Sequence, residues 1–157
     1  RRRGWCVRCN GMNIRRATPM DVSALYILLD KMHRETVMSV APINPEKLIG
    51  AINTAIHRGV VLLAEVKNKI VGSIGGIASP EWWSDQMHLS DMWFYVLPDS
   101  RNSSAAIKLV KSFIKIGNEA NMKIKLGHVY SGDFERKDKF FGRLGLVKAG
   151  SLYTEVN

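Results

Sequence analysis

Residues 95–113 carry the sequence YVLPDSRNSSAAIKLVKSF, the most informative segment of the chain. An aromatic and aliphatic run stops at Pro98, and a short stretch of small and polar residues follows it. Over 105–120 the apolar residues recur at helical spacing, with lysines between them. The segment is therefore predicted to be the end of a strand, a tight loop and an amphipathic helix.

Two helices are predicted ahead of this segment, after a short strand over 13–16. Thr18-Pro19 is typical of a helix start, with a capping oxygen and a proline in the first turn, and this helix is expected to end near Glu35. A second helix begins at Asn44-Pro45 by the same logic and stops at Gly59.

The remaining elements are mostly strands. Apolar runs over 60–66 and 70–78 predict a hairpin, and residues 80–86 (PEWWSDQ) predict a loop before a long strand over 88–97. Beyond the central helix we expect a strand, a helix and a closing strand, over 123–130, 135–144 and 146–156. The order β-α-α-β-β-β-α-β-α-β predicts one mixed α/β (α+β) domain.

Composition limits the class of protein. The chain has 157 residues, of which 46% are hydrophobic and 24% charged, and this is enough to bury a core within one domain. The only cysteines are Cys6 and Cys9, which excludes a disulfide scaffold. No apolar run approaches the roughly 20 residues of a membrane helix. A soluble, cytoplasmic domain without membrane contact is expected.

Part of the formal charge of +9 lies at the N-terminus. Residues 1–11 (RRRGWCVRCNG) contain four arginines and no acid, and they are predicted to be a basic arm or extension ahead of a single domain at 12–157. Such an arm can bind nucleic acid, but a solvated tail is the preferred interpretation. The two cysteines have the spacing of half a zinc site, no second pair follows, and no metal site is predicted.

Three segments, in this element order, resemble the GCN5-related N-acetyltransferase (GNAT) superfamily. VVLLAEVKNKIVGSIGG at 60–76 resembles its second and third strands, the segment at 95–113 resembles its acetyl-CoA motif, and ERKDKFFGRLGLVKAG at 135–150 resembles its closing helix and strand. The combination is similar to small acetyltransferases encoded by bacteriophages. The resemblance spans 12–157 and implies a mixed, mostly antiparallel sheet flanked by helices.

The resemblance also implies acetyl-CoA as co-substrate. A helix N-terminus after small residues suits its pyrophosphate, because unpaired N–H groups and the helix dipole attract anions. Both glycines of the family motif are missing, and an ordinary helix cap by Ser103 with a solvent-facing Arg101 is the alternative. In relatives the preceding strand splays from its neighbour and its backbone holds the pantetheine arm. The predicted cofactor-binding residues are Phe94, Tyr95, Val96, Arg101, Asn102, Ser103, Ser104, Ala105 and Ala106.

Direct transfer of acetyl to an amine in a ternary complex needs a group that accepts the amine proton. Asp91 is the preferred base, and strict strand alternation would place it on one face with Trp93 and Tyr95, whereas a β-bulge would shift that register. A solvated or ion-paired carboxylate is the structural alternative for Asp91. The competing candidates for the base are Glu81, Asp85 and His88.

The leaving thiolate needs a proton, which many relatives supply from a tyrosine four residues before the closing glycine. Phe141 occupies that position here, and a phenyl ring has no proton to give. Tyr130 is therefore the predicted acid, with water as the alternative.

The acceptor site is expected between the first two helices and the loops 36–45 and 80–86. Trp82 and Trp83 can wall a cationic amine and Glu81 and Asp85 can attract it, or the tryptophans can simply cap the core. The acceptor, a small molecule or a protein amine, is not specified by the sequence.

Two other functions are kept as alternatives. A non-catalytic CoA-binding or regulatory module is suggested by Phe141 and the glycine-free loop, and a nucleic-acid-associated base-modifying protein by the basic arm. A homodimer is also compatible with the sequence.

Overall fold

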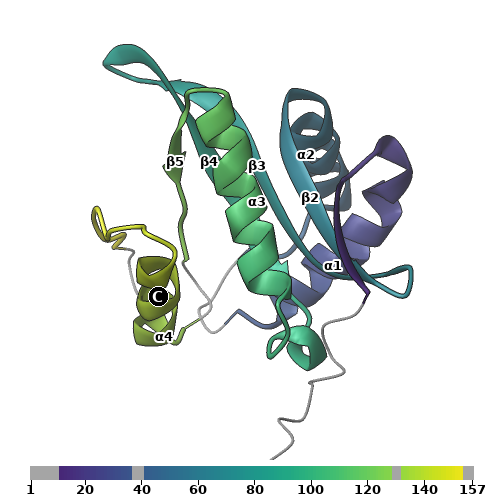
Figure 1. Cartoon of the computed structure of the whole chain (residues 1–157). Coiled ribbons are helices and arrows are strands. Elements are labelled where there is room, and N and C mark those ends of the chain that lie inside the picture. Colours follow the sequence, from purple (N-terminus) through teal and green to yellow (C-terminus); the bar gives the residue numbers. More distant parts are fainter. Residues whose placement is uncertain (1–10, 37–40, 129–131, 154–157) are drawn as a thin grey trace, which may run out of the picture.

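The computed structural model describes residues 11–36, 41–128 and 132–153. Its centre is a five-stranded sheet in the order β1-β2-β3-β4-β5, in which neighbours pair antiparallel except for the parallel pair β4–β5 (Figure 1). The strands are β1 (Met12–Arg16), β2 (Gly59–Val66), β3 (Lys69–Glu81), β4 (Ser84–Val96) and β5 (Lys123–Lys125).

Helices cover both faces of the sheet. α1 and α2 pack on one face, and α3 and α4 on the other. The helices are α1 (Val22–Arg34), α2 (Pro45–Arg58), α3 (Ala105–Glu119) and α4 (Phe134–Arg143), with short 3-10 turns η2 (Pro19–Asp21) and η3 (Pro98–Ser100). The predicted starts at Thr18-Pro19 and Asn44-Pro45 are confirmed, and Asn44 caps α2 by accepting from the N–H of Lys47 at 3.1 Å.

Alternate residues of β2 supply two hydrophobic cores. Leu62 and Ala64 face α3, whereas Val61 and Leu63 face α1 and α2. All four are at most 3% exposed. Burial of a large aliphatic side chain contributes roughly 1.5–3 kcal/mol, so the two cores fix the sheet between its helix layers.

A β-bulge in β4 controls which side chains face which layer. Gly75 pairs with Trp93 and Gly76 with Asp91, so Met92 has no partner in β3. A Cβ on Gly75 would lie 2.2 Å from Cζ2 of Trp93, which means that only glycine lets the indole pack there. Trp93 joins the core under α1 and α2, and its Nε1 donates to the buried Ser73 hydroxyl at 3.0 Å.

Two sequence predictions about strands are wrong. The loop predicted over 80–86 is a continuation of β3 and β4 around a two-residue turn at Trp82-Trp83, because Pro80 pairs with Met87 and Glu81 with Ser84. The long hairpin projects beyond the rest of the sheet in Figure 1.

The predicted closing strand is also not formed within the described residues 145–153. Val147 and Leu152 are 88% and 66% exposed, and within this segment Leu146 packs against the core. The strand predicted over 123–130 is shorter as well, because β5 pairs with β4 only through Lys125 and residues 129 and 130 lie outside the described part. Among the described helices, none combines the length and the apolar character needed to cross a bilayer.

Candidate functional site

The loop before α3 is shaped by its own hydrogen bonds. The N–H of Ser103 donates to the carbonyl of Ser100 at 3.1 Å, and the Ser103 hydroxyl accepts from the N–H of Ala105 at 3.2 Å. Ser103 thus bonds to the first residue of α3 as its alternative role requires, but the N-cap itself is Ser104, whose side chain makes no capping bond. The first turn of α3 still leaves main-chain N–H groups without helical acceptors, and the small side chains over 102–106 leave them approachable by an anion.

Arg101 contacts protein groups at this loop. Its Nε donates to the carbonyl oxygen of Val96 at 3.0 Å, and its Nη2 donates to the carboxylate of Glu35. The guanidinium also lies 5.5 Å from the ring centre of Tyr95. Arg101 is thus neither free in solvent nor directed only at the helix N-terminus. A bound phosphate would compete with Glu35 for its charge.

Glu35 joins the end of α1 to the end of β4. Its carboxylate accepts hydrogen bonds from the Tyr95 hydroxyl and from Arg101. Burial opposes ionisation of Glu35, but these two hydrogen bonds outweigh it and hold its pKa below the usual value. Burial and the bond to Glu35 raise the pKa of Tyr95 to about 12, so this phenol stays protonated at neutral pH.

The pairing between strands β4 and β5 ends close to the bulge in β4. Their pairing runs from His88↔Lys123 to Ser90↔Lys125 and stops there, while β4 continues to Val96. The next contact between β4 and the segment after β5 is made by a side chain, because Asp91 accepts a hydrogen bond from the N–H of Gly127 at 2.8 Å. The pairing of β4 with β5 therefore ends before Phe94, Tyr95 and Val96, which is compatible with the splay that the resemblance implies.

Asp91 has the properties of a group that handles protons. Burial raises its pKa to about 6, and the hydrogen bond from Gly127 and the positive field of His128 offset only part of this effect. It makes no ion pair with any described residue. The expectation that it shares a face with Trp93 and Tyr95 is wrong, because the bulge turns it towards the α4 side.

His128 was missed by sequence reasoning. It lies just past Gly127, and its Nε2 is 2.8 Å from Oδ1 of Asp138 on α4. Lys148 donates to the other carboxylate oxygen at 3.1 Å, and these bonds to His128 and Lys148 lower the pKa of Asp138. The pair is ten residues apart and joined through a loop, so no helical or strand spacing connects it. The only signal in the sequence for this pair is Asp138, a carboxylate on the predicted helix that also carries Phe140 and Phe141.

Aromatic rings fill the space between β4 and α4. Phe94 stacks on Phe140 with ring centres 6.2 Å apart, and His128 stacks on Phe141 at 5.6 Å. Phe141 is 9% exposed, which fits the core role expected for one of the two phenylalanines. Tyr130, the predicted acid, lies outside the described residues.

The predicted acceptor residues at the hairpin lie at the opposite end of β4 from Tyr95 and Arg101. Trp82 and Trp83 are 90% and 64% exposed and pack edge to face, which excludes a capping role over the core. Glu81 accepts from Lys125 at 2.8 Å, whose ammonium lies 6.0 Å from the Trp83 ring. The structure does not bring these residues, or Asp85, together with the loop that follows α1. Their part in acceptor binding stays a prediction.

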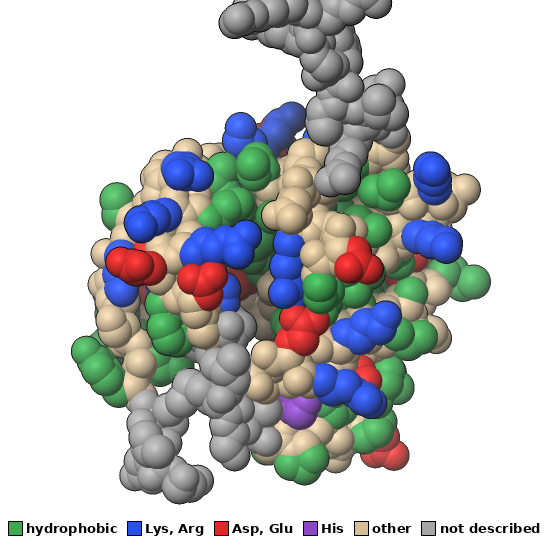
Figure 2. Space-filling model, turned by 90° about the horizontal axis from the view of Figure 1, so that it is seen from below, with side chains coloured by type: hydrophobic (Ala, Val, Ile, Leu, Met, Phe, Trp, Pro, Cys, Tyr) green, Lys and Arg blue, Asp and Glu red, His purple; other side chains and the backbone are tan. Residues whose placement is uncertain are grey.

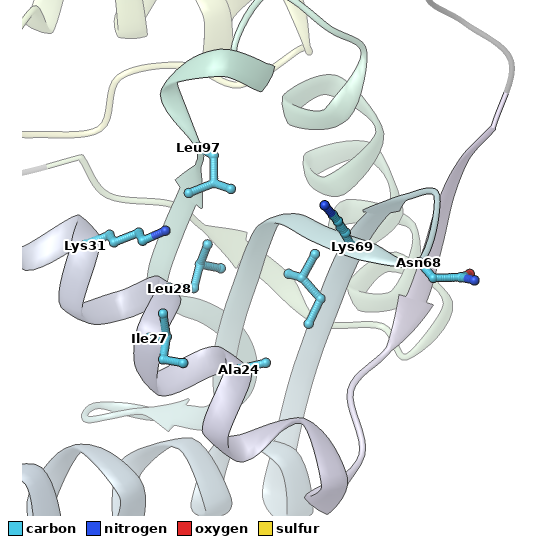
Figure 3. A pocket seen from close by; sticks show the side chains of 8 residues that line it. Ala24, Ile27, Leu28, Lys31, Asn68, Lys69 and Leu97 are labelled. Atoms are coloured by element: carbon cyan, nitrogen blue, oxygen red, sulfur yellow. The ribbon is translucent and has the colours of Figure 1, made fainter.

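A cavity of about 310 Å³ lies between α1 and the β2–β3 turn (Figure 3). Its walls are mainly apolar, and two lysines stand at its edge. The lining residues are Ala24, Ile27, Leu28, Lys31, Asn68, Lys69, Ile70 and Leu97. None of them was predicted as a site residue, although Leu97 directly precedes η3.

Figure 2 shows the end of the molecule at which α3 begins. Lys and Arg side chains are spread over this surface among Asp and Glu, so it is mixed in charge and offers several cations near the helix N-terminus. Within the described ranges, no group of three or more His, Cys, Asp or Glu side chains is placed to hold a metal ion.

A five-stranded sheet between two helix layers, in which the pairing of β4 with β5 ends at Ser90 while β4 continues towards the loop before α3, is the fold of the GCN5-related N-acetyltransferases. The predicted fold class is confirmed. No protein-family model matches the chain, and no curated protein matches its sequence.

Individual solved structures show the likeness. A predicted acetyltransferase with acetyl-CoA from Clostridium acetobutylicum has a TM-score of 0.73 at 19% identity, covering 93% of this chain and 96% of its own. Glucosamine-6-phosphate N-acetyltransferase from Arabidopsis thaliana has a TM-score of 0.70 at 12% identity, covering 93% and 98%. AAC(6')-Iy, in complex with the bisubstrate analogue CoA-S-monomethyl-acetylneamine, has a TM-score of 0.75 at 11% identity, covering 94% and 99%. At these identities the likeness establishes the fold.

Proposed function

We propose that the protein is an acetyl-CoA-dependent N-acetyltransferase that moves the acetyl group directly to an amine within a ternary complex. The observation that carries this proposal is that β4 loses its pairing with β5 after Ser90 and then continues to Val96, just before the loop that opens α3. Similar folds have been solved with acetyl-CoA and with a CoA-linked bisubstrate analogue, which supports the same ligand here.

The residues present fit acetyl-CoA. The N–H groups over 102–106 suit the pyrophosphate, and the unpaired edge of β4 at Phe94, Tyr95 and Val96 suits the pantetheine amides. Arg101 is close enough to this loop to exchange Glu35 for a phosphate. When bound, acetyl-CoA supplies an activated acetyl thioester.

Asp91 acts as the base for the amine in this proposal. It must be a carboxylate to accept a proton, so it is active above its pKa of about 6 and inactive well below it. A base with a pKa near the working pH takes up a proton more effectively than an ordinary surface carboxylate. Its position where the pairing of β4 with β5 ends, held by the N–H of Gly127, supports this role.

The acceptor class rests on similarity. The similar structures include glucosamine-6-phosphate N-acetyltransferase and a complex with an acetylneamine analogue, which favours a small-molecule amine for this chain. The cytoplasmic location, the bacteriophage similarity, the homodimer and the nucleic-acid role of the arm stay predictions. So does the division into an arm at 1–11 and a domain at 12–157.

The test is binding combined with turnover. Acetyl-CoA is expected to bind in calorimetry, and CoA is expected to be released when a panel of amines is added. Arg101→Ala should weaken acetyl-CoA binding about tenfold, the scale of one charge-assisted contact, whereas Lys111→Ala on exposed α3 should not. Binding without CoA release across the panel would favour the non-catalytic module. No binding would refute the proposal.

A further inference from the structure

His128 lies in the segment after β5, with one ring nitrogen beside a carboxylate and the other without a hydrogen bond. Its Nε2 faces Asp138 at 2.8 Å, and a carboxylate so placed holds the ring proton on Nε2 in the neutral form. The ring is fixed by contacts with Phe134 and Phe141, whose centres are 5.8 and 5.6 Å away. Orientation and tautomer are therefore both set by α4.

The other nitrogen has no partner among the described residues. Nδ1 of His128 is fully buried and makes no hydrogen bond. Nδ1 of His88 is buried without a hydrogen bond as well, but it lies 3.7 Å from a carboxylate oxygen of Glu81. A buried polar atom without a partner costs roughly 1–3 kcal/mol. A ligand that enters the gap between β4 and the segment after β5, and uncovers Nδ1 of His128, would give this nitrogen a partner.

We propose that His128 is the general acid that protonates the sulfur of the departing CoA, and that Asp138 is its positioning residue. This inference rests on the proposed function. It follows from the free Nδ1, from the carboxylate behind the ring, and from the neighbouring Asp91–Gly127 contact that marks the mouth of the gap.

The proton balance closes without any further reactant. The amine nitrogen loses a proton to Asp91, and the N–H bond electrons stay on nitrogen in the amide. The C–S bond breaks with its electrons on sulfur, and an S–H bond forms as the Nδ1–H bond of the imidazolium breaks. Asp91 then returns its proton to the neutral imidazole, which restores both groups.

Acidic side chains lie on two sides of His128. Asp138 faces it from α4 and Asp91 faces it from β4, while Lys148 is held by the far oxygen of Asp138. The phenyl ring of Phe141, stacked on the imidazole, cannot itself give a proton.

The main test compares two histidines. His128→Gln keeps a donor for Asp138 but no transferable proton, and its kcat should fall roughly 100-fold with unchanged acetyl-CoA affinity. His57→Gln, on the exposed end of α2, is the matched control and should keep wild-type kcat. Unchanged kcat in His128→Gln, with an active wild type, would overturn the inference and leave the proposed function intact.

A second readout does not depend on turnover. In the wild type, saturation with CoA should shift the ¹⁵N resonance of His128 Nδ1 and leave that of Nε2 nearly unchanged. Saturation without any Nδ1 shift would show that the ring does not meet the sulfur, and this would overturn the inference. Failure of the wild type to bind CoA at all would refute the proposed function and this inference together.

The neighbouring aromatic position offers a rescue. Phe141→Tyr alone should change kcat less than twofold, because His128 already supplies the proton. In the double variant His128→Gln/Phe141→Tyr, the phenol introduced at position 141 lies beside position 128 and can give the proton. Its kcat should be at least tenfold higher than that of His128→Gln. Equal kcat in the single and double His128 variants would count against a shared proton site.

Asp138 is tested as a positioning residue. Asp138→Asn should lower kcat about tenfold at constant KM, and the ¹⁵N spectrum of His128 should change from one tautomer to a mixture. A loss of kcat with a single unchanged tautomer would contradict the positioning role.

Discussion

The two ends of β4 carry clusters made of the same parts. At the hairpin end, His88 has its Nε2 3.1 Å from the Ser79 hydroxyl, and its Nδ1 is 3.7 Å from Glu81, which is paired with Lys125. At the α4 end, His128 has its Nε2 on Asp138, which is paired with Lys148, and its Nδ1 faces no partner.

The difference lies in which nitrogen the carboxylate takes. In the hairpin cluster Glu81 lies on the Nδ1 side of His88 and the Ser79 hydroxyl on its Nε2 side. Nδ1 is buried and makes no hydrogen bond in either histidine, but in His88 it lies 3.7 Å from Oε1 of Glu81, whereas the carboxylate of Asp138 in the α4 cluster is on the Nε2 side of His128. Residues of the same types are thus arranged differently around the two rings, and we expect a structural role for the hairpin cluster and the proposed chemical role only for the α4 cluster.

The largest expected effect concerns Asp91, the proposed proton acceptor beside the α4 cluster. Asp91→Asn should lower kcat/KM by 100-fold to 1,000-fold at pH 8, because the amide cannot take the amine proton. The wild-type kcat/KM should fall as pH drops through about 6, as the carboxylate is protonated. Asp30→Asn, a surface carboxylate paired with Arg34, is the control. A wild-type-like pH–rate profile in Asp91→Asn would return Asp91 to a structural role.

The same substitution should raise stability. The folded pKa of Asp91 lies near 6 and the unfolded value near 3.8, so folding is favoured by the protonated form and the wild type loses stability as pH rises from 4 to 6. Asp91→Asn keeps the acceptor for Gly127 and removes this loss, for a gain of roughly 1–3 kcal/mol at pH 8. Denaturant unfolding at pH 8 and 3.5 checks this, and equal gains at both would contradict it.

The stability contributed by the hairpin cluster should depend on pH in the opposite direction from that of Asp91. The hydrogen bond from Lys125 lowers the pKa of Glu81, so its contribution to stability is present at neutral pH and is lost as pH falls below its usual value of 4.5. Glu81→Gln should therefore lower the unfolding temperature at pH 7, and the difference from wild type should shrink on acidification. A difference independent of pH would show that charge is not the cause.

The smallest effect is expected at His88. His88→Gln should change kcat less than twofold and lower the unfolding temperature modestly, because the ring serves Ser79 and Glu81 at the far end of the strand. Steady-state kinetics beside a thermal melt measures both. A loss of kcat as large as that of His128→Gln would remove the distinction between the two clusters.

Local signals in the sequence were enough for most of the fold. Proline and capping residues marked the starts of α1 and α2, and the glycine-rich hairpin and the break at Pro98 fixed the sheet. The bulge in β4 could not be read from the strand itself, because it depends on Trp93 packing across Gly75 of the neighbouring strand.

The site residues that are adjacent in the sequence could be predicted, whereas those brought together from distant positions could not. The loop before α3 is continuous in sequence, and so its residues were found together. The pair of His128 and Asp138 forms across a turn, and Glu35 meets Arg101 from 66 residues away. Residue types alone made the hairpin carboxylates as attractive as Asp91, and burial distinguishes them.

The exposed tryptophans of the hairpin give the molecule separate optical signals for its regions. Trp82 and Trp83 are open to water, whereas Trp93 is 5% exposed and lies two residues from Asp91. In a Trp5→Phe variant, which removes the fourth tryptophan of the chain, a water-soluble quencher should extinguish the emission of the hairpin pair first and leave the blue-shifted emission of Trp93. The protein thus carries a native fluorophore beside the bulge of β4, suited to following events there without an added label.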